Sequence, residues 1–333
     1  MLDLARMRRI RLSPRPKVQQ LVGYALLMPN YKALPGVDIV FEGVEHLPEH
    51  PVVYAMNHTD RYNYFPFQYQ LWRSLERYTA TWVKGKYYEN AFIGQFMERT
   101  NNIPTPSKGY ILTRDFLSTL GRTPTDGEYA AARRWVDLVA EDADTEDVDL
   151  DAIPHAIRSR PRDLLGRRFD PGVEDYAHAV DQLFRAMMRE FVALNERTFE
   201  LGLDLLVFPQ GTRSVRLSRG HIGLSQIALR YKQTIVPVGC SGSDRVHPGG
   251  SPIAKRGRIV YRFGEPIRYA DMSEFHIDAD YEPFTAEAER THRVAFQGYV
   301  DAVMERINGL VDPEYQFADD LQSRGVSGAD RFV

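Results

Sequence analysis

A histidine followed five residues later by an asparagine is the pattern in this chain with the clearest chemical meaning. His58 and Asn63 lie in the run YAMNHTDRYN at 54–63, directly after an apolar segment. Imidazole suits proton transfer because its ordinary pKa, about 6.5, lies near neutral pH. The amide oxygen of Asn63 can accept a hydrogen bond from the second ring nitrogen. The pair therefore predicts a general base held by an amide, and a purely structural histidine is the alternative.

A second block, FPQGTRS at 208–214, lies about 150 residues further along and also follows an apolar segment. Gln210 offers both a donor and an acceptor, but no charge. Arg213 can bind a phosphate or a carboxylate through two parallel hydrogen bonds. The block predicts a binding loop at a strand end, and an ordinary turn with an exposed arginine is the alternative.

Together the two blocks resemble the core motifs of the glycerolipid acyltransferases, the PlsC-like family that acylates lysophosphatidic acid and its relatives. In that family the motifs read His-x4-Asp and Phe-Pro-Glu-Gly-Thr-Arg, so both acids are replaced here by their amides. The resemblance implies that His58 is the catalytic base and that Asn63 holds its ring. It also implies an acceptor-binding role for four residues of the second block, Gln210, Gly211, Thr212 and Arg213.

Three further blocks follow the family order. The segment 92–107 resembles the family's third motif, but Thr105 and its neighbours stand where the family usually has Ile-Asp-Arg, whose arginine binds the glycerol phosphate. Lys84, Lys86 or Lys108 is a candidate substitute. Pro237, in the apolar segment 235–238, matches a strand that flanks the acyl pocket in the family. A late segment, 263–267, also matches.

The lost negative charges leave three interpretations open. In a serine protease, replacing the acid that holds the catalytic histidine by its amide costs about 10⁴-fold in kcat, mainly through the wrong tautomer. Asp60 is a candidate for compensation here. The chain is therefore an active acyltransferase, a non-catalytic relative that binds acyl chains or lipids, or an engineered inactive version. If it is active, restoring the acid with Asn63→Asp should leave activity similar or raise it.

Strand and helix patterns alternate along the chain, which is typical of an α/β protein. We expect a mostly parallel sheet covered by helices on both faces, in a PlsC-like acyltransferase fold with a long helical insertion at about 113–202. The expected strands are 37–41, 52–56, 78–83, 203–208, 234–238 and 258–263, and the expected helices are 66–77, 91–98, 222–231 and 285–310. We place an N-terminal segment at 1–36, the acyltransferase domain at 37–311 and a polar, mobile tail at 312–333.

The insertion has an acid-rich run at 137–151, interpreted as a solvated or disordered loop, and then a basic run. A long helix follows, in which methionine and aromatic residues such as Met187 and Phe191 repeat at three- and four-residue spacing. This stripe is either ordinary core, which is more common, or the lining of an acyl tunnel.

Basic residues precede an apolar segment at 18–28 that is too short to span a bilayer. This pattern predicts an interfacial membrane anchor, and a packed helix with a solvated basic arm is the alternative. The net charge of −3 argues against nucleic-acid partners, and the single Cys240 fits a reducing compartment. We expect a cytoplasmic protein, with peripheral attachment to the inner face of the membrane left open.

The resemblance implies transfer of a fatty acyl group from a thioester, either acyl-CoA or acyl carrier protein, to a hydroxyl or amine of a lipid-like acceptor, as in 1-acylglycerol-3-phosphate acyltransferases. The thioester is a co-substrate, and no metal or other cofactor is expected. Ligands of open α/β sheets bind beyond the carboxyl ends of the strands. The sequence therefore predicts that His58, Asn63, Gln210 and Arg213 converge on one cleft at that edge.

Overall fold

Seven strands form one sheet at the centre of the chain. The computed structural model describes residues 1–33, 36–49 and 51–321. The strand order is β1-β9-β8-β2-β7-β3-β4, and every neighbouring pair is parallel except β8 and β9. The bounds are β1 Val37–Glu42, β2 Val53–Met56, β3 Thr79–Lys84, β4 Asn102–Thr105, β7 Asp204–Val207, β8 Ile235–Ser241 and β9 Gly257–Phe263. The expected α/β class with a mostly parallel sheet is confirmed.

The central strand β2 shows why the sheet must be covered on both faces. All four of its residues are buried. Val53 and Ala55 pack into one apolar cluster, whereas Tyr54 and Met56 pack into the other. Since side chains alternate across a strand, apolar residues at every position require helices on both sides.

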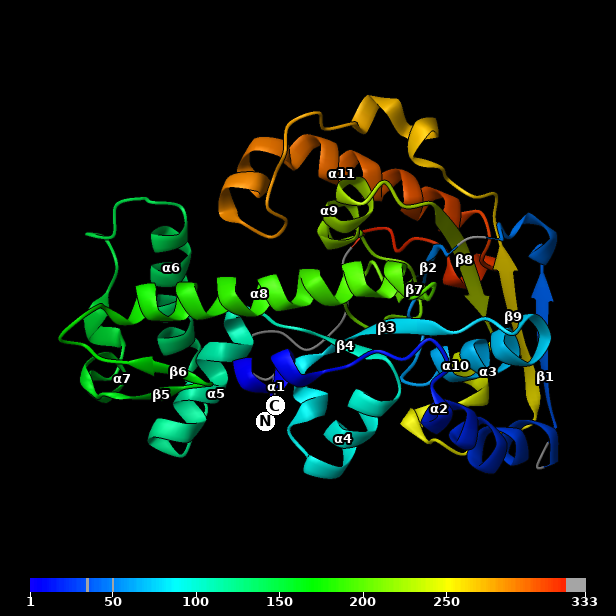
Figure 1. Cartoon of the computed structure of the whole chain (residues 1–333), viewed down its shortest axis with the longest axis horizontal. Helices are drawn as coiled ribbons and strands as arrows, with labels where there is room; N and C mark the ends of the chain where they lie inside the picture. Colours follow the sequence, from blue (N-terminus) through cyan, green and yellow to red (C-terminus); the bar gives the residue numbers. More distant parts are fainter. Residues whose placement is uncertain (34–35, 50, 322–333) are drawn as a thin grey trace.

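Helices of the two faces come from different parts of the chain (Figure 1). The first cluster contains residues of α8 (Tyr176–Glu200), α9 (Gly223–Arg230) and α11 (Ala286–Asn308). The second contains residues of α3 (Tyr64–Leu75) and α10 (Ser243–Val246). Within the seven-stranded sheet, β4 is the strand that the sequence analysis did not predict, and it contains Pro104. This proline is tolerated because β4 is an edge strand, where one backbone donor needs no partner.

The expected insertion forms a helical unit on the left of Figure 1. It comprises α5 (Lys108–Leu120), α6 (Asp126–Ala140), α7 (His155–Ser159), the hairpin of β5 (Arg162–Leu164) and β6 (Arg167–Phe169), and then α8. Met187 and Phe191 are buried in its core and do not line the large cavity described below, so the stripe is core. The acid-rich run begins at the end of α6 and is mostly exposed after Ala140.

The N-terminal segment packs against the rest of the chain. Helix α1 (Leu4–Arg9) buries Leu4 and Met7, and its Arg6 is buried in an ion pair with Glu98. Arg6, one of the basic residues expected in a solvated arm, is therefore part of the folded core. Helix α2 (Lys17–Val22) continues into two π-helical segments, Gly23–Leu27 and Pro29–Ala33, in which apolar side chains stay exposed. No helix in the described ranges is long and apolar enough to cross a bilayer.

The chain after α11 does not leave the body of the protein at once. The Leu217 N–H donates to the Tyr315 carbonyl, the Ala318 N–H donates to the Leu217 carbonyl, and Leu217 and Phe317 form a parallel bridge. Residues 312–321 of the predicted tail therefore pack beside the segment that follows the FPQGTRS block. The remainder of that tail lies outside the described residues.

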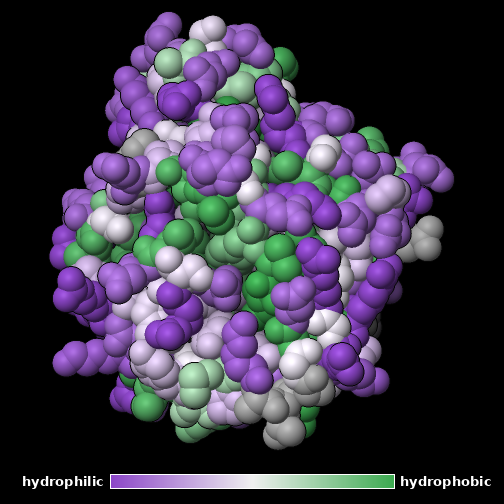
Figure 2. All heavy atoms as spheres, turned by 90° about the vertical axis from the view of Figure 1, so that its right-hand side faces the viewer, coloured by the Kyte–Doolittle hydropathy of each residue, from purple (hydrophilic) through white to green (hydrophobic). Residues whose placement is uncertain are grey.

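The opposite edge of the sheet is formed by β1. Figure 2 looks onto this side of the molecule and shows apolar side chains in a band across its middle, bordered by hydrophilic ones. Within β1 the buried side chains of Val37 and Ile39 alternate with the exposed Asp38. A charged residue on an edge strand discourages pairing with another chain.

Candidate functional site

The carboxyl ends of four neighbouring strands surround a cavity of about 1140 Å³. Because the strands run in the order β8-β2-β7-β3, the sequence segments that follow them are laid out in the same order. Asp244 and His247 follow β8, and His58 follows β2. Arg213 follows β7, and Lys84 ends β3; all five residues line the cavity. The base candidate thus lies between an acidic side and a basic side.

His58 is held by the residue that the motif predicted. The Nδ1 atom of His58 lies 3.0 Å from the Oδ1 atom of Asn63. The Nδ2 atom of Asn63 donates to the Asn57 carbonyl at 2.8 Å. A carbonyl oxygen can only accept, so the orientation of the Asn63 amide is fixed. Its oxygen must face His58, which places the imidazole proton on Nδ1 and leaves the Nε2 lone pair for proton transfer.

Two other strands lock this arrangement in place. The Asn57 side chain donates to the Cys240 carbonyl at 2.9 Å and accepts from the Cys240 N–H at 2.7 Å. The Tyr261 hydroxyl, from β9, donates to the Asn63 carbonyl at 2.6 Å. Asn57, Asn63 and Tyr261 are all buried. The loop that carries His58 is therefore tied to β8 and β9 through buried hydrogen bonds.

Gln210 uses its amide in a similar way. Its Oε1 atom accepts from the His58 backbone N–H at 3.1 Å. Its Nε2 atom donates to the Arg216 carbonyl and to the Ser218 hydroxyl, each at 3.4 Å. Gln210 is only 1 % exposed. Each of the two amides thus joins a donor on one side to a backbone carbonyl on the other, which a carboxylate cannot do without repulsion between oxygens.

The ring of His58 is kept neutral by its surroundings. It stacks on Phe208 with ring centroids 4.1 Å apart. Burial lowers the pKa of His58 to about 3, against the opposing effect of the Asn63 hydrogen bond, and nearby Arg213 and Lys84 lower it further. Imidazole at this position is therefore unprotonated at neutral pH, as a base must be, but it is a weak base.

Positive charges gather on one side of His58. Arg61, Lys84, Lys86 and Arg213 all line the cavity. Burial lowers the pKa of Lys86, and the charges of Arg213 and Arg61 lower it further, so these three groups lie within electrostatic range of one another. Such a cluster is suited to an anionic group of a ligand.

The structure brings most of the predicted residues together, although not all at the cavity wall. Gly211, Thr212 and Arg213 line the cavity, and Gln210 lies behind them. Gly211 has a φ of 65°, and a Cβ there would meet the His221 ring at 2.7 Å, so this turn requires glycine.

Two of the predicted residues are placed elsewhere. Pro237 is buried within β8 opposite Ala55 and is not among the residues lining the cavity. Lys108 does not line the cavity either, and its ammonium lies 3.0 Å from Asp137 and 3.7 Å from Asp181. Of the three lysines weighed as phosphate ligands, only Lys84 and Lys86 reach the cavity.

Asp244, His247 and Arg61 were missed by the sequence analysis. Asp244 and His247 could have been found from their position, because they follow β8, the strand that contains Pro237. Since β8 is parallel to β2, the segments after both strands lie at the same edge of the sheet.

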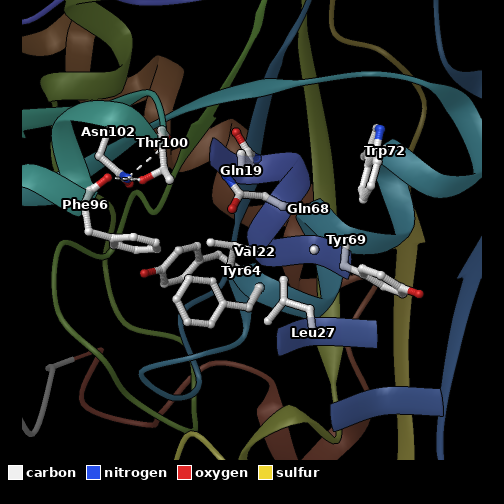
Figure 3. Close-up of a pocket in the computed structure, with 12 residues that line it drawn as sticks. Gln19, Val22, Leu27, Tyr64, Gln68, Tyr69, Trp72, Phe96, Thr100 and Asn102 are labelled. Atoms are coloured by element: carbon white, nitrogen blue, oxygen red, sulfur yellow. Dashed lines mark hydrogen bonds between the residues drawn. The ribbon is translucent and has the colours of Figure 1, made fainter. Parts of the chain in front are cut away.

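An apolar pocket adjoins the large cavity (Figure 3). It lies between α2, α3 and α4 (Ala91–Arg99), and it shares Tyr64, Phe65 and Phe96 with the large cavity. Figure 3 shows the side chains of Val22, Leu27, Tyr64 and Phe96 converging on this space. Its volume, about 30 Å³, leaves room for only one or two water molecules. The pocket marks the apolar side of the site, but it is too small for an acyl chain in this conformation.

Comparisons with known proteins give remote structural similarity only. No family model matches the chain, and no curated protein matches it. Among solved structures, the 1-acyl-sn-glycerophosphate acyltransferase PlsC from Thermotoga maritima is similar over 90 % of this chain and 80 % of that one, with 14 % sequence identity and a TM-score of 0.37. A similarity at that score carries no argument about function, so the site must be judged on its own geometry.

The fixed amide predicts the effect of restoring the acid of the family motif. In Asn63→Asp one carboxylate oxygen would replace Nδ2 at 2.8 Å from the Asn57 carbonyl, in a fully buried position. We expect the free energy of unfolding to fall by about 1–3 kcal/mol, the cost of a buried polar group without its partner. We also expect Asn63→Asp not to raise acyl transfer, whereas the family motif alone allows a gain.

A matched control is Asn90→Asp. The Asn90 side chain only accepts, from the N–H groups of Phe92 and Ile93 at the start of α4, so an acid fits there equally well. Chemical denaturation of the three proteins checks both expectations. An Asn63→Asp variant as stable as the wild type would show that the Asn57 carbonyl does not constrain this position.

Proposed function

We propose that the chain is an acyltransferase that moves a fatty acyl group from a thioester to a hydroxyl or amine of a lipid-like acceptor. The observation that carries the proposal is the imidazole of His58, whose Nδ1 atom is held by Asn63 while the ring faces a cavity of about 1140 Å³. Such a cavity is large enough for two ligands of moderate size. The absence of a negative partner does not exclude base catalysis, because the Asn63 oxygen still selects the productive tautomer.

In this mechanism the acceptor oxygen or nitrogen attacks the thioester carbonyl while Nε2 of His58 takes its proton. The new carbon–oxygen or carbon–nitrogen bond forms, and the carbon–sulfur bond then breaks. The imidazolium returns the proton to the departing thiolate, which leaves as a thiol. Asn63 stabilises the imidazolium only through the dipole of its amide, so we expect slower turnover than a carboxylate partner would give in a site built to hold one.

Burial is the largest cause of the low pKa of His58, and the neighbouring cations are a smaller one. Arg213 and Lys84 lower that pKa, and an anionic group bound between them would offset their charges. His58 then becomes a stronger base when such a ligand is present. We propose that Arg213, Lys84 and Lys86 bind a phosphate of the acceptor or of the donor, in the role that the family gives to the missing arginine.

One observation favours a second function, the binding of an acyl chain or lipid without catalysis. A base whose pKa is about 3 removes a proton from a hydroxyl inefficiently, because catalysis is best when the pKa of the base is close to the working pH. If ligand binding does not raise that pKa, the site retains the shape of an acyltransferase but not its chemistry.

A single assay separates these two functions. Wild-type protein is incubated with mixed acyl-CoAs or acyl carrier proteins and a panel of lipid alcohols and amines, and the products are identified by mass spectrometry. We expect acylated acceptor from the wild type and a loss of about 10²–10⁴-fold in His58→Ala, the usual contribution of a general base. Asn90→Asp is the control, and we expect it to fold and to transfer acyl groups like the wild type.

The outcomes of that assay are distinct. Transfer that persists undiminished in His58→Ala would overturn the mechanism. Binding of acyl-CoA that is equal in the wild type and His58→Ala, with no product from either, would support the non-catalytic alternative.

We also propose that the protein reaches its lipid acceptor from a membrane surface. Leu21 and Leu26 are 65 % and 63 % exposed on the segment that begins at α2, and the basic residues Arg15 and Lys17 lie directly before them. Apolar side chains beside basic ones are typical of an interfacial segment, and each basic residue near an anionic surface contributes about 1 kcal/mol.

Flotation with vesicles of phosphatidylglycerol tests this binding. We expect the wild type to float with the vesicles at low salt and to lose most of that binding in the double variant Leu21→Asp, Leu26→Asp. Val294→Asp is the matched control, since Val294 is also an exposed apolar residue but lies on α11. Flotation that resists both salt and the double substitution would remove this proposal.

A further inference from the structure

The loop between β7 and α9, residues 208–222, depends on partners from the end of the chain. All of its residues are described and they form no helix or strand, yet Leu217 is fully buried. Buried backbone groups in such a loop need hydrogen-bond partners outside it. The Tyr315 carbonyl accepts from the Leu217 N–H at 3.0 Å, and the Ala318 N–H donates to the Leu217 carbonyl at 2.9 Å. The C-terminal segment 312–321 therefore orders a loop that forms part of the cavity wall.

The side chain of Tyr315 contacts a second segment, which follows β8. Its hydroxyl donates to the Asp244 carboxylate at 2.7 Å and accepts from the Gly242 N–H at 3.1 Å. Tyr315 is 1 % exposed. Burial raises the pKa of Tyr315, and the hydrogen bond to Asp244 raises it further, so the hydroxyl remains a donor. Because β2 lies between β7 and β8, this one residue bonds to the segments on both sides of the strand that leads to His58.

The loop after β7 carries the first of two hydrogen-bonded chains from Tyr315 to His58. The Tyr315 carbonyl holds Leu217, and the carbonyl of the preceding residue, Arg216, accepts from the Gln210 amide at 3.4 Å. The oxygen of that amide accepts from the His58 N–H at 3.1 Å. Gln210 and Leu217 are both buried, so these contacts are shielded from water. A movement of Tyr315 is thereby passed to the backbone of the candidate base.

The second chain runs through the end of β8. Gly242, which donates to the tyrosine hydroxyl, lies two residues after Cys240. The Cys240 N–H and carbonyl bond to the Asn57 side chain at 2.7 and 2.9 Å. The Asn57 carbonyl in turn accepts from the Asn63 amide that holds the His58 ring. The same tyrosine therefore supports both the backbone and the imidazole of His58.

Arginines attach the C-terminal segment to both of these segments as well. Arg216, in the loop after β7, donates to the carbonyls of Gln316 and Phe317, the first at 3.2 Å. Arg245, after β8, pairs with Glu314 at 2.6 Å. These arginines are exposed, so each contact contributes less than the buried ones. Their positions show that the C-terminal segment is bonded to the two segments along its length, and not at Tyr315 alone.

We propose that residues 312–321 form a clamp on the two segments beside His58, and that Tyr315 is a positioning residue for the base. Side chains of functional sites keep their geometry when a surrounding shell of hydrogen bonds holds the loops that carry them. Loosening the clamp frees the loop that contains Gln210 and Arg213, and with it the His58 backbone. This inference rests on the proposed function for the role of His58 as a base, but not for the geometry of the clamp.

Hydrogen exchange of single amides, measured by NMR, tests the clamp without ligand or turnover. Tyr315→Phe keeps the ring and the backbone carbonyl but removes both contacts of the hydroxyl. We expect the His58 and Leu217 amide hydrogens to exchange about tenfold faster, because the loss of two buried hydrogen bonds favours local opening. The Val53 amide, within the buried strand β2, reports global unfolding and should change less.

A second variant and two controls locate the effect. Arg216→Ala removes an exposed side chain that bonds to the C-terminal segment, so it should fold and should also accelerate exchange at the two site amides. Tyr281→Phe is the matched control for the tyrosine, since its hydroxyl donates to the Gln226 carbonyl at 2.9 Å and neither residue lines the cavity. Arg197→Ala, which loses a pair with Glu200, is the control for the arginine. We expect both controls to leave exchange at the site amides unchanged.

The outcomes separate a positioning residue from a merely structural one. Acceleration in Tyr315→Phe that is no greater at His58 than at Val53 reflects global stability alone, and it overturns the positioning role. Unchanged exchange of the His58 amide in Arg216→Ala as well overturns the clamp.

Acyl transfer measured in parallel separates the clamp from the proposed function. If the wild type transfers no acyl group, faster local exchange still supports the clamp, and only the catalytic proposal fails. If it does transfer, we expect Tyr315→Phe to lower kcat several-fold and Tyr281→Phe to leave it unchanged. A kcat that stays the same in Tyr315→Phe despite faster exchange at His58 would contradict the positioning role.

Discussion

The hydrogen bond from the Asn63 amide to the Asn57 carbonyl is the constraint on which the rest of the site depends. It fixes which end of the amide faces His58, and so decides which ring nitrogen carries the proton. Asn57 is in turn held by the backbone of Cys240 on the neighbouring strand. An amide at this position does what a carboxylate does for ring orientation and tautomer, but it adds no charge. Both Asn63 and Gln210 use an amide donor as well as an amide acceptor, so an amide suits the partners that each side chain has.

The sheet converts this local arrangement into a polarised cavity. Because β8, β2, β7 and β3 are adjacent and parallel, four segments from distant parts of the sequence end side by side. Asp244 and His247 follow β8 at one side, Lys84 ends β3 at the other, and His58 follows β2 between them. Burial lowers the pKa of His58 most, and the cations that suit this side of the cavity to an anion lower it further.

Sequence patterns were sufficient for the sheet class, for most of its strands and for the pairing of His58 with Asn63. They failed where the answer depends on contacts between distant residues. Motif spacing could not show that Gln210 faces the His58 backbone, that Lys108 is held by Asp137, or that Asp244 and His247 close the cavity. The short strand β4 was not predicted; it contains Pro104, a residue that disfavours a strand except at a sheet edge, and edge position is a property of the whole fold. The role of Asn63 itself depends on a carbonyl that no side-chain pattern reveals.

The most direct test of the central claim is the protonation state of His58, read from the ¹⁵N resonances of imidazole-labelled protein. The structure predicts a proton on Nδ1, a lone pair on Nε2 and no titration between pH 8 and pH 5, because the pKa of about 3 lies below that range. Comparison with His58→Gln assigns the resonances. A proton on Nε2, or an imidazolium that forms near the ordinary pKa of about 6.5 in the ligand-free protein, would contradict the account.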